Sequence, residues 1–247
     1  MNCVLVAGGA TGIGAAAVRA FRAQGDAVYL ADRNGVGAKA VVAEGGPGVA
    51  EAGEFDFANP ESPARAIAAA AEFAGGLDTV FYNAGVLDAH PLSEWTTATW
   101  DRAVAVNLRA PFLMAQAAAP WLAASACGRL IVTSSTGGIR GHAGMPAYHA
   151  TKSGVLGLVR SLADELGPLG VTVNALCPGW VDTPFNNSYW SHQEEPEAAL
   201  RRLTATIPLR RQAVPDDIVG TVLFLASPAA AYITGQAIVV DGGYTAV

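Results

Sequence analysis

The chain has 247 residues, a formal net charge of −6 at pH 7, 51% hydrophobic residues and only 15% charged residues. This composition supplies a sizeable apolar core and excludes intrinsic disorder, which needs low hydrophobicity and high net charge. The acidic balance, with no run of Lys or Arg, excludes a nucleic-acid surface, and no apolar run approaches the roughly 20 residues of a membrane span.

Short apolar, β-branched runs alternate with longer Ala-rich patterns of helical period along the whole chain. They predict strands over residues 2–7, 26–31, 49–55, 77–82, 128–134, 170–176 and 236–240. They predict helices over residues 12–24, 60–74, 99–125, 146–166 and 215–226, the third kinked at Pro120. Apolar strands joined through helices indicate an α/β fold: one doubly wound Rossmann-type domain over 1–247, with a parallel seven-stranded sheet and helices on both faces.

One long segment has no obvious strand pattern. Residues 184–206, "PFNNSYWSHQEEPEAALRRLTAT", are mixed in character and too long for a simple connection. We therefore expect this segment to be either helical or mobile, and to form a lid over a substrate.

A glycine-rich turn follows the first strand. "GGATGIG" at 8–14 precedes an Ala-rich helix, and its glycines allow close approach of a pyrophosphate to the helix N-terminus. Asp32 ends the second strand about 20 residues later, where a ribose-binding acid belongs in a dinucleotide fold. A carboxylate there repels a 2′-phosphate and favours NAD over NADP. Arg33 is the opposing feature, because a guanidinium attracts that phosphate, so NADP stays an alternative.

The stretch "YHATK" at 148–152 places a phenol and an ammonium four residues apart. Tyr148 and Lys152 therefore share one face of the predicted helix. Taken alone, this spacing also fits an ordinary exposed helix. Its chemical interpretation is that the ammonium, together with the positive nicotinamide ring of NAD⁺, lowers the phenol pKa from about 10 to about 7, which suits a base that removes an alcohol proton.

Several motifs occur together in one order. They are the glycine turn, "YNAG" at 82–85, Asn107 in "VAVNLRAPF", "TSS" at 133–135, "YHATK" and "CPGWVDTP" at 177–184. With "LFLAS" and "ITGQAIVVDGG" near the C-terminus, they resemble the short branch of the short-chain dehydrogenase/reductase family over essentially the whole chain. One departure is Ala7, where that family usually has a threonine.

The resemblance implies an NAD-dependent oxidoreductase that interconverts a secondary alcohol and a ketone by hydride transfer. The alternatives are an NADP-dependent reductase similar to 3-oxoacyl-carrier-protein reductases and a non-catalytic NAD(H)-binding regulator. The implied catalytic residues are Asn107, Ser135, Tyr148 and Lys152. Ser135 is preferred over Ser134 because it lies thirteen residues before the tyrosine, the spacing usual in that family.

Each of these four residues has an implied role. Tyr148 is the general acid and base, and Lys152 lowers its pKa and binds the nicotinamide ribose. Ser135 donates a hydrogen bond to the substrate oxygen, and Asn107 holds a water that links Lys152 to solvent.

The resemblance also implies the ligand contacts. The expected cofactor contacts are Gly8, Thr11, Gly12, Ile13, Gly14, Asp32, Arg33, Asp56, Phe57, Asn83, Ala84, Gly85, Tyr148, Lys152, Pro178, Gly179, Val181 and Thr183. The expected substrate contacts are Ser135, His142, Met145, Tyr148, Trp180, Phe185 and Trp190. This mainly apolar and aromatic wall predicts a small hydrophobic alcohol or ketone. His149 is expected on another side of the helix, at the surface or in an interface.

The cysteines and the N-terminus bear on location. Cys3, Cys127 and Cys177 are scattered without a CxxC motif, so we expect neither a disulfide framework nor a metal site. "MNCVLVAGG" lacks the positively charged start of a signal peptide, which favours the cytoplasm. The resemblance implies a homotetramer assembled through helices 99–125 and 146–166 and the last strand.

Overall fold

Seven parallel strands form one sheet in the computed structural model, which describes residues 1–247. Their order is β3-β2-β1-β4-β5-β6-β7, so the order along the chain reverses between β1 and β4. Such a reversal opens a crevice beyond the carboxyl ends of the strands, where ligands bind. The sheet confirms the predicted fold class. Its strands are β1 Cys3–Ala7, β2 Ala27–Asp32, β3 Ala50–Glu54, β4 Thr79–Tyr82, β5 Arg129–Thr133, β6 Thr172–Pro178 and β7 Ala237–Val240.

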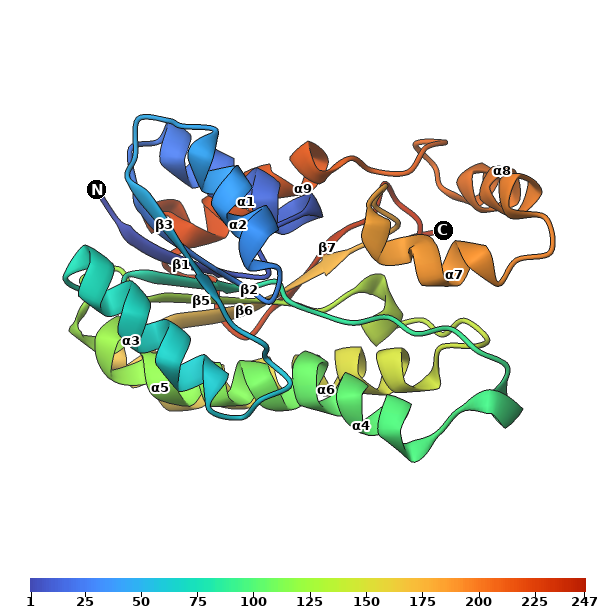
Figure 1. Cartoon of the computed structure of the whole chain (residues 1–247), viewed down its shortest axis with the longest axis horizontal. Coiled ribbons are helices and arrows are strands. Elements are labelled where there is room, and N and C mark those ends of the chain that lie inside the picture. Colours follow the sequence, from blue (N-terminus) through green and yellow to red (C-terminus); the bar gives the residue numbers. More distant parts are fainter.

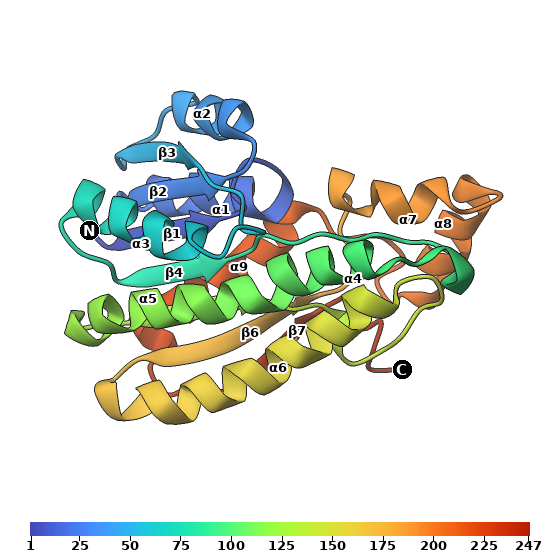
Figure 2. The ribbon, with the colours of Figure 1, turned by 60° about the horizontal axis from the view of Figure 1, so that its bottom comes forward.

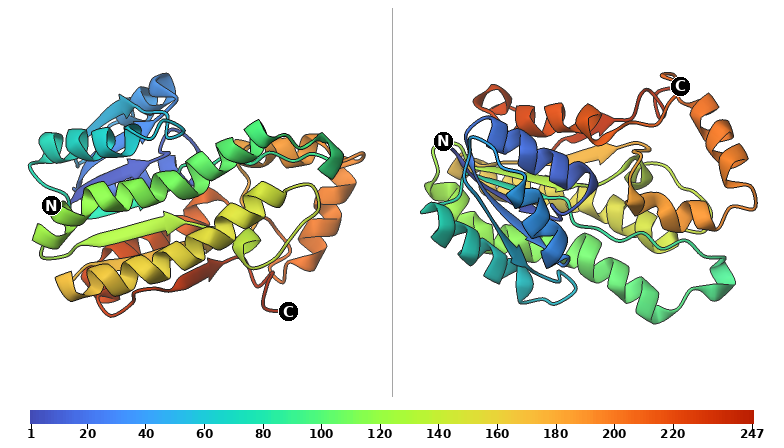
Figure 3. Two further views of the ribbon diagram at one scale, coloured as in Figure 1. Left: turned by 90° about the horizontal axis from the view of Figure 1, so that it is seen from below. Right: turned by 45° about the horizontal axis from the view of Figure 1, so that its top comes forward.

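Helices cover both faces of this sheet (Figures 1 and 3). One face carries α1 Gly12–Ala23, α2 Gly35–Ala43 and α9 Pro215–Ala226. The other carries α3 Ser62–Ala74, α5 Ala110–Ala124 and α6 Pro146–Leu166. A separate apolar core fills each interface, and this explains why the central strands read as continuous apolar runs. No helix combines the length and the apolar character needed to cross a membrane.

Helix α2 was absent from the sequence prediction. Gly35 and Gly37 in its first turn are poor helix formers and give the segment the look of a turn. The side-chain Oδ1 of Asn34 accepts a hydrogen bond from the Gly37 N–H at 2.9 Å and so caps the helix. Capping and packing of Ala38 and Val41 in the core outweigh the weak local propensity.

The predicted helix over 99–125 consists of three parts. Helix α4 spans Thr97–Val104, a π-helical turn spans Ala105–Arg109, and α5 continues to Ala124 through Pro120. Figure 2 shows α4 and α5 running on from one another along the sheet. The departure from α-helical geometry therefore lies around Asn107 rather than at Pro120, and π-turns of this kind are frequent at functional sites.

Residues 184–206 are helical, which was one of the two expectations. A short 3₁₀ turn over Pro184–Asn186 leads into α7 Asn187–Ser191 and then α8 Pro196–Thr206. Both helices lie at the end of the molecule opposite the N-terminus, beyond the sheet (Figure 1).

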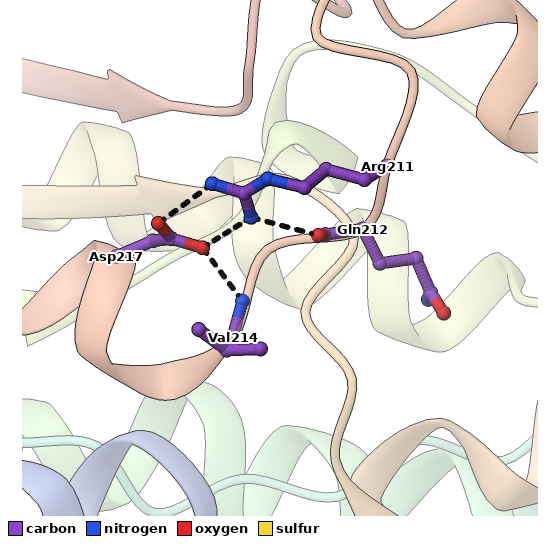
Figure 4. A network of polar contacts seen from close by, with 4 residues as sticks. All are labelled: Arg211, Gln212, Val214 and Asp217. Atoms are coloured by element: carbon purple, nitrogen blue, oxygen red, sulfur yellow. Dashed lines mark hydrogen bonds and ion pairs between the residues drawn. The ribbon is translucent and has the colours of Figure 1, made fainter.

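The segment between α8 and α9 is held in place by backbone and side-chain contacts. Ala213 pairs with Val181 in an isolated parallel bridge. Arg211 donates hydrogen bonds to both oxygens of the Asp217 carboxylate, which also accepts the Val214 N–H at 2.8 Å (Figure 4). These hydrogen bonds lower the pKa of Asp217 to about 2. The start of α9 thus holds the return of the 184–206 segment against the end of β6.

Candidate active site

A cavity of about 510 Å³ lies beyond the carboxyl ends of the strands, at the place where α/β folds bind ligands. The glycine turn, the ends of β2, β4, β5 and β6, and the start of α6 line it. It brings together almost all of the predicted contact residues. Gly14 and Trp190 do not line it, and Asn107 lies behind its wall.

The glycine turn is shaped by close backbone contacts. Gly8 has a φ of +81°, and a β-carbon there would lie 2.5 Å from the backbone nitrogen of Ala84. A β-carbon on Gly14 would lie 1.9 Å from the Gly8 carbonyl oxygen. Gly14 therefore contributes by letting α1 start against the turn, not by lining the cavity. The turn and the exposed N–H groups of α1 fit a bound pyrophosphate.

Asp32 stands at the end of β2 with a fixed carboxylate. Its Oδ2 accepts the Ala10 N–H at 3.0 Å, and its Oδ1 accepts the Asn34 N–H at 2.9 Å. Each oxygen retains a further lone pair for a hydroxyl donor. The carboxylate lines the cavity next to the turn, which fits a ribose diol, and Arg33 lies beside it with its side chain exposed.

Asn83 ties three strand ends together. Its amide Nδ2 donates to the Gly8 carbonyl at 3.1 Å, and its Oδ1 accepts from the Thr133 hydroxyl at 3.1 Å. The side chain therefore shapes the glycine turn from behind while the residue lines the cavity.

Tyr148 and Lys152 lie one turn apart near the start of α6, as the spacing predicts. Their exposed fractions are only 9% and 2%. The Lys152 Nζ lies 5.8 Å from the Tyr148 ring centroid and donates to the Thr133 carbonyl at 2.7 Å. Because α6 begins directly at Pro146, the first turn points both side chains to the cavity.

Burial dominates the pKa values of this pair. Burial raises the pKa of Tyr148 to about 12, opposed by a hydrogen bond with Ser135. Burial also lowers the pKa of Lys152 to about 8. Burial therefore sets the pKa of Tyr148 in the protein without cofactor, and the expected lowering by Lys152 together with the positive nicotinamide ring stays a prediction.

The two serines after β5 have different surroundings. The Ser135 hydroxyl accepts the Gly137 N–H at 2.9 Å and hydrogen bonds to Tyr148. The Ser134 hydroxyl is buried and donates to the Lys152 backbone carbonyl at 2.8 Å, tying β5 to α6. The geometry supports Ser135 as the residue that faces a reacting oxygen.

Asn107 connects the π-turn to two other elements. Its Oδ1 accepts the Val86 N–H at 2.8 Å, and its Nδ2 donates to the Val86 carbonyl at 2.9 Å and to the Thr151 hydroxyl at 3.2 Å. Both amide hydrogens are thus engaged by protein groups. The side chain positions the loop after β4 against α6.

The substrate half of the cavity has an aromatic wall. Phe185 lies beside Tyr148, with ring centroids 6.1 Å apart, and Met145 and Trp180 also contribute. Trp190 packs against Trp180, with ring centroids 5.4 Å apart, and does not line the cavity, so its contact with substrate stays a prediction. Its contribution is to support the wall.

Sequence reasoning placed His149 wrongly and missed other lining residues. His149 is half-buried and lines the cavity instead of facing away, because the loop after β5 folds over that side of α6. Arg102 also lines the cavity one helical turn before Val106, a spacing that the sequence displays. The further residues missed are Phe55, Ala58, Val106, Thr133, Thr136, Gly137, Pro184 and Asn186.

Potential metal ligands are not clustered. No group of three or more His, Cys, Asp or Glu side chains is arranged to hold a metal ion, and the three cysteines are free thiols. The donors gathered at the cavity suit a dinucleotide and an oxygen-bearing substrate.

Comparison with known proteins agrees with this geometry. The family model described as enoyl-(acyl carrier protein) reductase matches residues 8–245. The chain is 36% identical to a probable galactose dehydrogenase of Rhizobium meliloti, over 97% of this chain and 93% of the relative. It is 38% identical to a 2,5-dichloro-2,5-cyclohexadiene-1,4-diol dehydrogenase of Sphingobium indicum, over 98% and 95%.

The fold agrees as well. The crystal structure of levodione reductase superposes with a TM-score of 0.94 at 31% identity, covering 100% of this chain and 98% of that one. The sheet, the cavity and these relatives lead to one conclusion: the chain belongs to the short-chain dehydrogenase/reductase family and is an oxidoreductase of the alcohol–ketone type.

Proposed function

We propose that this protein is an NAD-dependent oxidoreductase that interconverts a secondary alcohol and a ketone by hydride transfer, with Tyr148 as general acid and base. The observation that carries the proposal is the convergence of Ser135, Tyr148 and Lys152 on one wall of the cavity that contains Asp32. The residues proposed to bind the cofactor and those proposed to act on the substrate thus line the same cavity.

Each catalytic residue has a separate role in the proposed reaction. When bound, a nicotinamide dinucleotide supplies the hydride acceptor and, in its oxidised form, a positive charge near the phenol. Ser135 donates a hydrogen bond to the substrate oxygen, and Tyr148 takes the hydroxyl proton during oxidation or returns it during reduction. Lys152 stabilises the phenolate, and its own proton is held by the Thr133 carbonyl.

We assign NAD as the preferred cofactor. The Asp32 carboxylate is fixed by two backbone N–H groups and cannot swing away to admit a 2′-phosphate without losing both hydrogen bonds. Arg33 is exposed at the rim and has no such constraint. The fixed Asp32 carboxylate therefore determines the cofactor preference more strongly than the unconstrained Arg33 guanidinium.

The substrate is proposed to be a small alcohol or ketone bound against Met145, Trp180 and Phe185. The relatives are named for a sugar and for a cyclic diol, which supports a CH–OH substrate. A second candidate is an NADP-dependent ketoacyl reductase, favoured by the acyl-carrier-protein description of the matching family model. The net charge of −6, without a basic run, weighs against docking of an acidic carrier.

Three further features complete the proposal. Residues 1–247 act as one domain in which 184–206 forms a substrate lid, since Phe185 and Asn186 at its start line the cavity. Exposed Phe112 and Trp121 on α5 support assembly into a homotetramer. The free thiols fit a reducing compartment, and we place the protein in the cytoplasm.

The decisive assay follows NADH and NADPH fluorescence over a panel of secondary alcohols, with NAD⁺ and NADP⁺ in parallel. The proposal expects turnover with NAD⁺ at a kcat/KM at least about tenfold above that with NADP⁺. Equal or greater efficiency with NADP⁺ contradicts the cofactor assignment. Binding of NADH without turnover of any alcohol or ketone favours a regulator instead.

A further inference from the structure

Three aromatic side chains from distant segments form a run that starts at the cavity wall beside Tyr148, where His149 and His142 line the cavity and Tyr244 lies behind them. The His149 ring lies 5.8 Å from the Tyr148 ring and 5.8 Å from the His142 ring, measured between centroids. The His142 ring in turn stacks on Tyr244 with centroids 6.3 Å apart and an interplanar angle of 8°. The run thus links α6, the loop after β5 and the C-terminal segment.

His149 fastens the loop that carries His142. Its Nδ1 lies 2.8 Å from the Gly137 carbonyl oxygen, which only accepts, so Nδ1 bears the proton. Its Nε2 then accepts the backbone N–H of His142 at 2.8 Å. Both ring nitrogens are engaged by the protein, so His149 positions the loop and offers nothing to a substrate.

His142 is different, because only one ring nitrogen has a protein partner. Its Nε2 lies 3.3 Å from the Tyr244 hydroxyl, and Trp180 contacts the ring edge-on at 5.5 Å. Tyr244 is itself buried and lies under the Arg140 guanidinium at 4.5 Å. The ring of His142 is therefore held in place while its Nδ1 has no protein partner in a residue that lines the cavity.

The free nitrogen can act as a donor or as an acceptor. Burial lowers the pKa of His142, so the ring is neutral at pH 7 and carries one proton. The Tyr244 hydroxyl can donate to or accept from Nε2, so either tautomer is satisfied. A substrate hydroxyl, which also donates and accepts, is the group that complements Nδ1 in both tautomers.

The residues around His142 in the substrate half of the cavity suggest what its Nδ1 atom binds. Ser135 and Tyr148 serve the reacting oxygen, whereas Met145, Trp180 and Phe185 around them are apolar or aromatic. We propose that His142 is a specificity-determining residue that binds a second oxygen of the substrate, so that cyclic diols and sugars, and the matching hydroxy ketones, are preferred over simple alcohols. This inference rests on the proposed function, and it replaces the purely hydrophobic substrate expected from the sequence.

A matched series of substrates measures the effect. The wild-type protein is assayed by NADH formation with cyclohexanol and with the cis and trans isomers of 1,2-, 1,3- and 1,4-cyclohexanediol. We expect the best diol to exceed cyclohexanol in kcat/KM by about 10- to 100-fold, because a buried site built to hydrogen bond a hydroxyl discriminates against its absence. The isomer that gains most reports the reach from Tyr148 to His142.

Variants locate the source of that gain. In His142→Leu the diol-to-cyclohexanol ratio should fall at least about tenfold, whereas His142→Gln, which keeps a donor and an acceptor, should retain most of it. Tyr244→Phe should give an intermediate ratio because the ring loses its anchor. Tyr232→Leu, at an exposed tyrosine outside both the cavity and residues 184–206, should keep the wild-type ratio. Thermal unfolding checks that each variant is folded.

The possible outcomes distinguish failure of the inference about His142 from failure of the proposed function. Turnover of cyclohexanol with no diol gain, or a gain that survives His142→Leu, overturns the inference about His142 alone. Failure of the wild-type protein to oxidise any of these compounds, or to reduce the corresponding ketones, with either cofactor contradicts the proposed function as well.

Discussion

The two ends of the cavity are built in different ways. The dinucleotide end uses the glycine turn and Asp32, which lie within residues 8–32 and are fixed largely by backbone contacts. The substrate end draws His142, Phe185 and Tyr244 from three segments far apart in the sequence. The glycine turn and Asp32 thus come from one short stretch of the chain, although Asn83 and Ala84 help to hold the turn, whereas the substrate end depends on packing between segments far apart in the sequence.

The largest effect is expected where the two ends meet. Tyr148→Phe removes the proton acceptor while keeping the ring, so turnover should fall by roughly 10²- to 10⁴-fold. The dinucleotide end should keep its affinity for NADH, measured by fluorescence titration. Turnover close to wild type would show that another group moves the proton, and a loss of NADH binding would show that the two ends are not separable.

The buried lysine at the same junction predicts a pH-dependent stability. The pKa of Lys152 is about 8 in the fold and near 10.4 in the unfolded chain, so between these values the unfolded state binds more protons. The free energy of unfolding should therefore rise with pH over this window, by about 3 kcal/mol from this group, and stay at its lower value below pH 8, where both states bind the proton.

Urea unfolding of wild type and Lys152→Met from pH 7.5 to 10 measures this contribution. The variant should lack the rise, while other groups titrate in both proteins. The pKa of Tyr148, about 12, makes its own contribution full below pH 10 and lost only above it. Parallel curves for the two proteins would contradict the burial of a charged lysine at neutral pH.

The cofactor end should respond to a single carboxylate. Asp32→Ser removes the charge that repels a 2′-phosphate and leaves Arg33 in place to attract it. The ratio of kcat/KM for NADP⁺ over NAD⁺ should rise by about 10- to 100-fold. Adding Arg33→Ala should remove much of that gain. An unchanged ratio in Asp32→Ser would mean that Asp32 does not select the cofactor.

The smallest effect is expected behind the substrate wall. Trp190→Ala deletes the ring that supports Trp180 and Tyr189, with centroids at 5.4 and 4.9 Å. The KM for the alcohol should rise by about three- to tenfold, while the KM for NAD⁺ stays close to wild type. Trp100→Ala, on exposed α4, is the matched control. Equal increases in both KM values would contradict a role confined to the substrate end.

The same contrast explains what the sequence could predict. The strands, the glycine turn and the Tyr148–Lys152 pair follow from local periodicity and spacing. Helix α2 was missed because its glycines oppose helix formation, although the Asn34 cap and core packing stabilise it. The signals that predict these features therefore lie in short stretches of the chain, whereas the packing that stabilises them does not.

Features set by tertiary contacts were not predictable. The side of α6 on which His149 lies depends on how the loop after β5 folds, and the position of Trp190 depends on the packing of 184–206. The high pKa of Tyr148 reflects its burial, which spacing alone does not reveal. Burial and long-range packing therefore account for most of the differences.

The central claim is that a hydride passes directly from the substrate to the cofactor within this cavity. An isotope-transfer experiment tests this claim most directly. A secondary alcohol deuterated at its carbinol carbon is incubated with the enzyme and NAD⁺, and the reduced cofactor is analysed by mass spectrometry. We predict that the deuterium appears in the cofactor, on one face of the nicotinamide. Loss of the deuterium to solvent, or a reduced cofactor that lacks it, would contradict hydride transfer within this cavity.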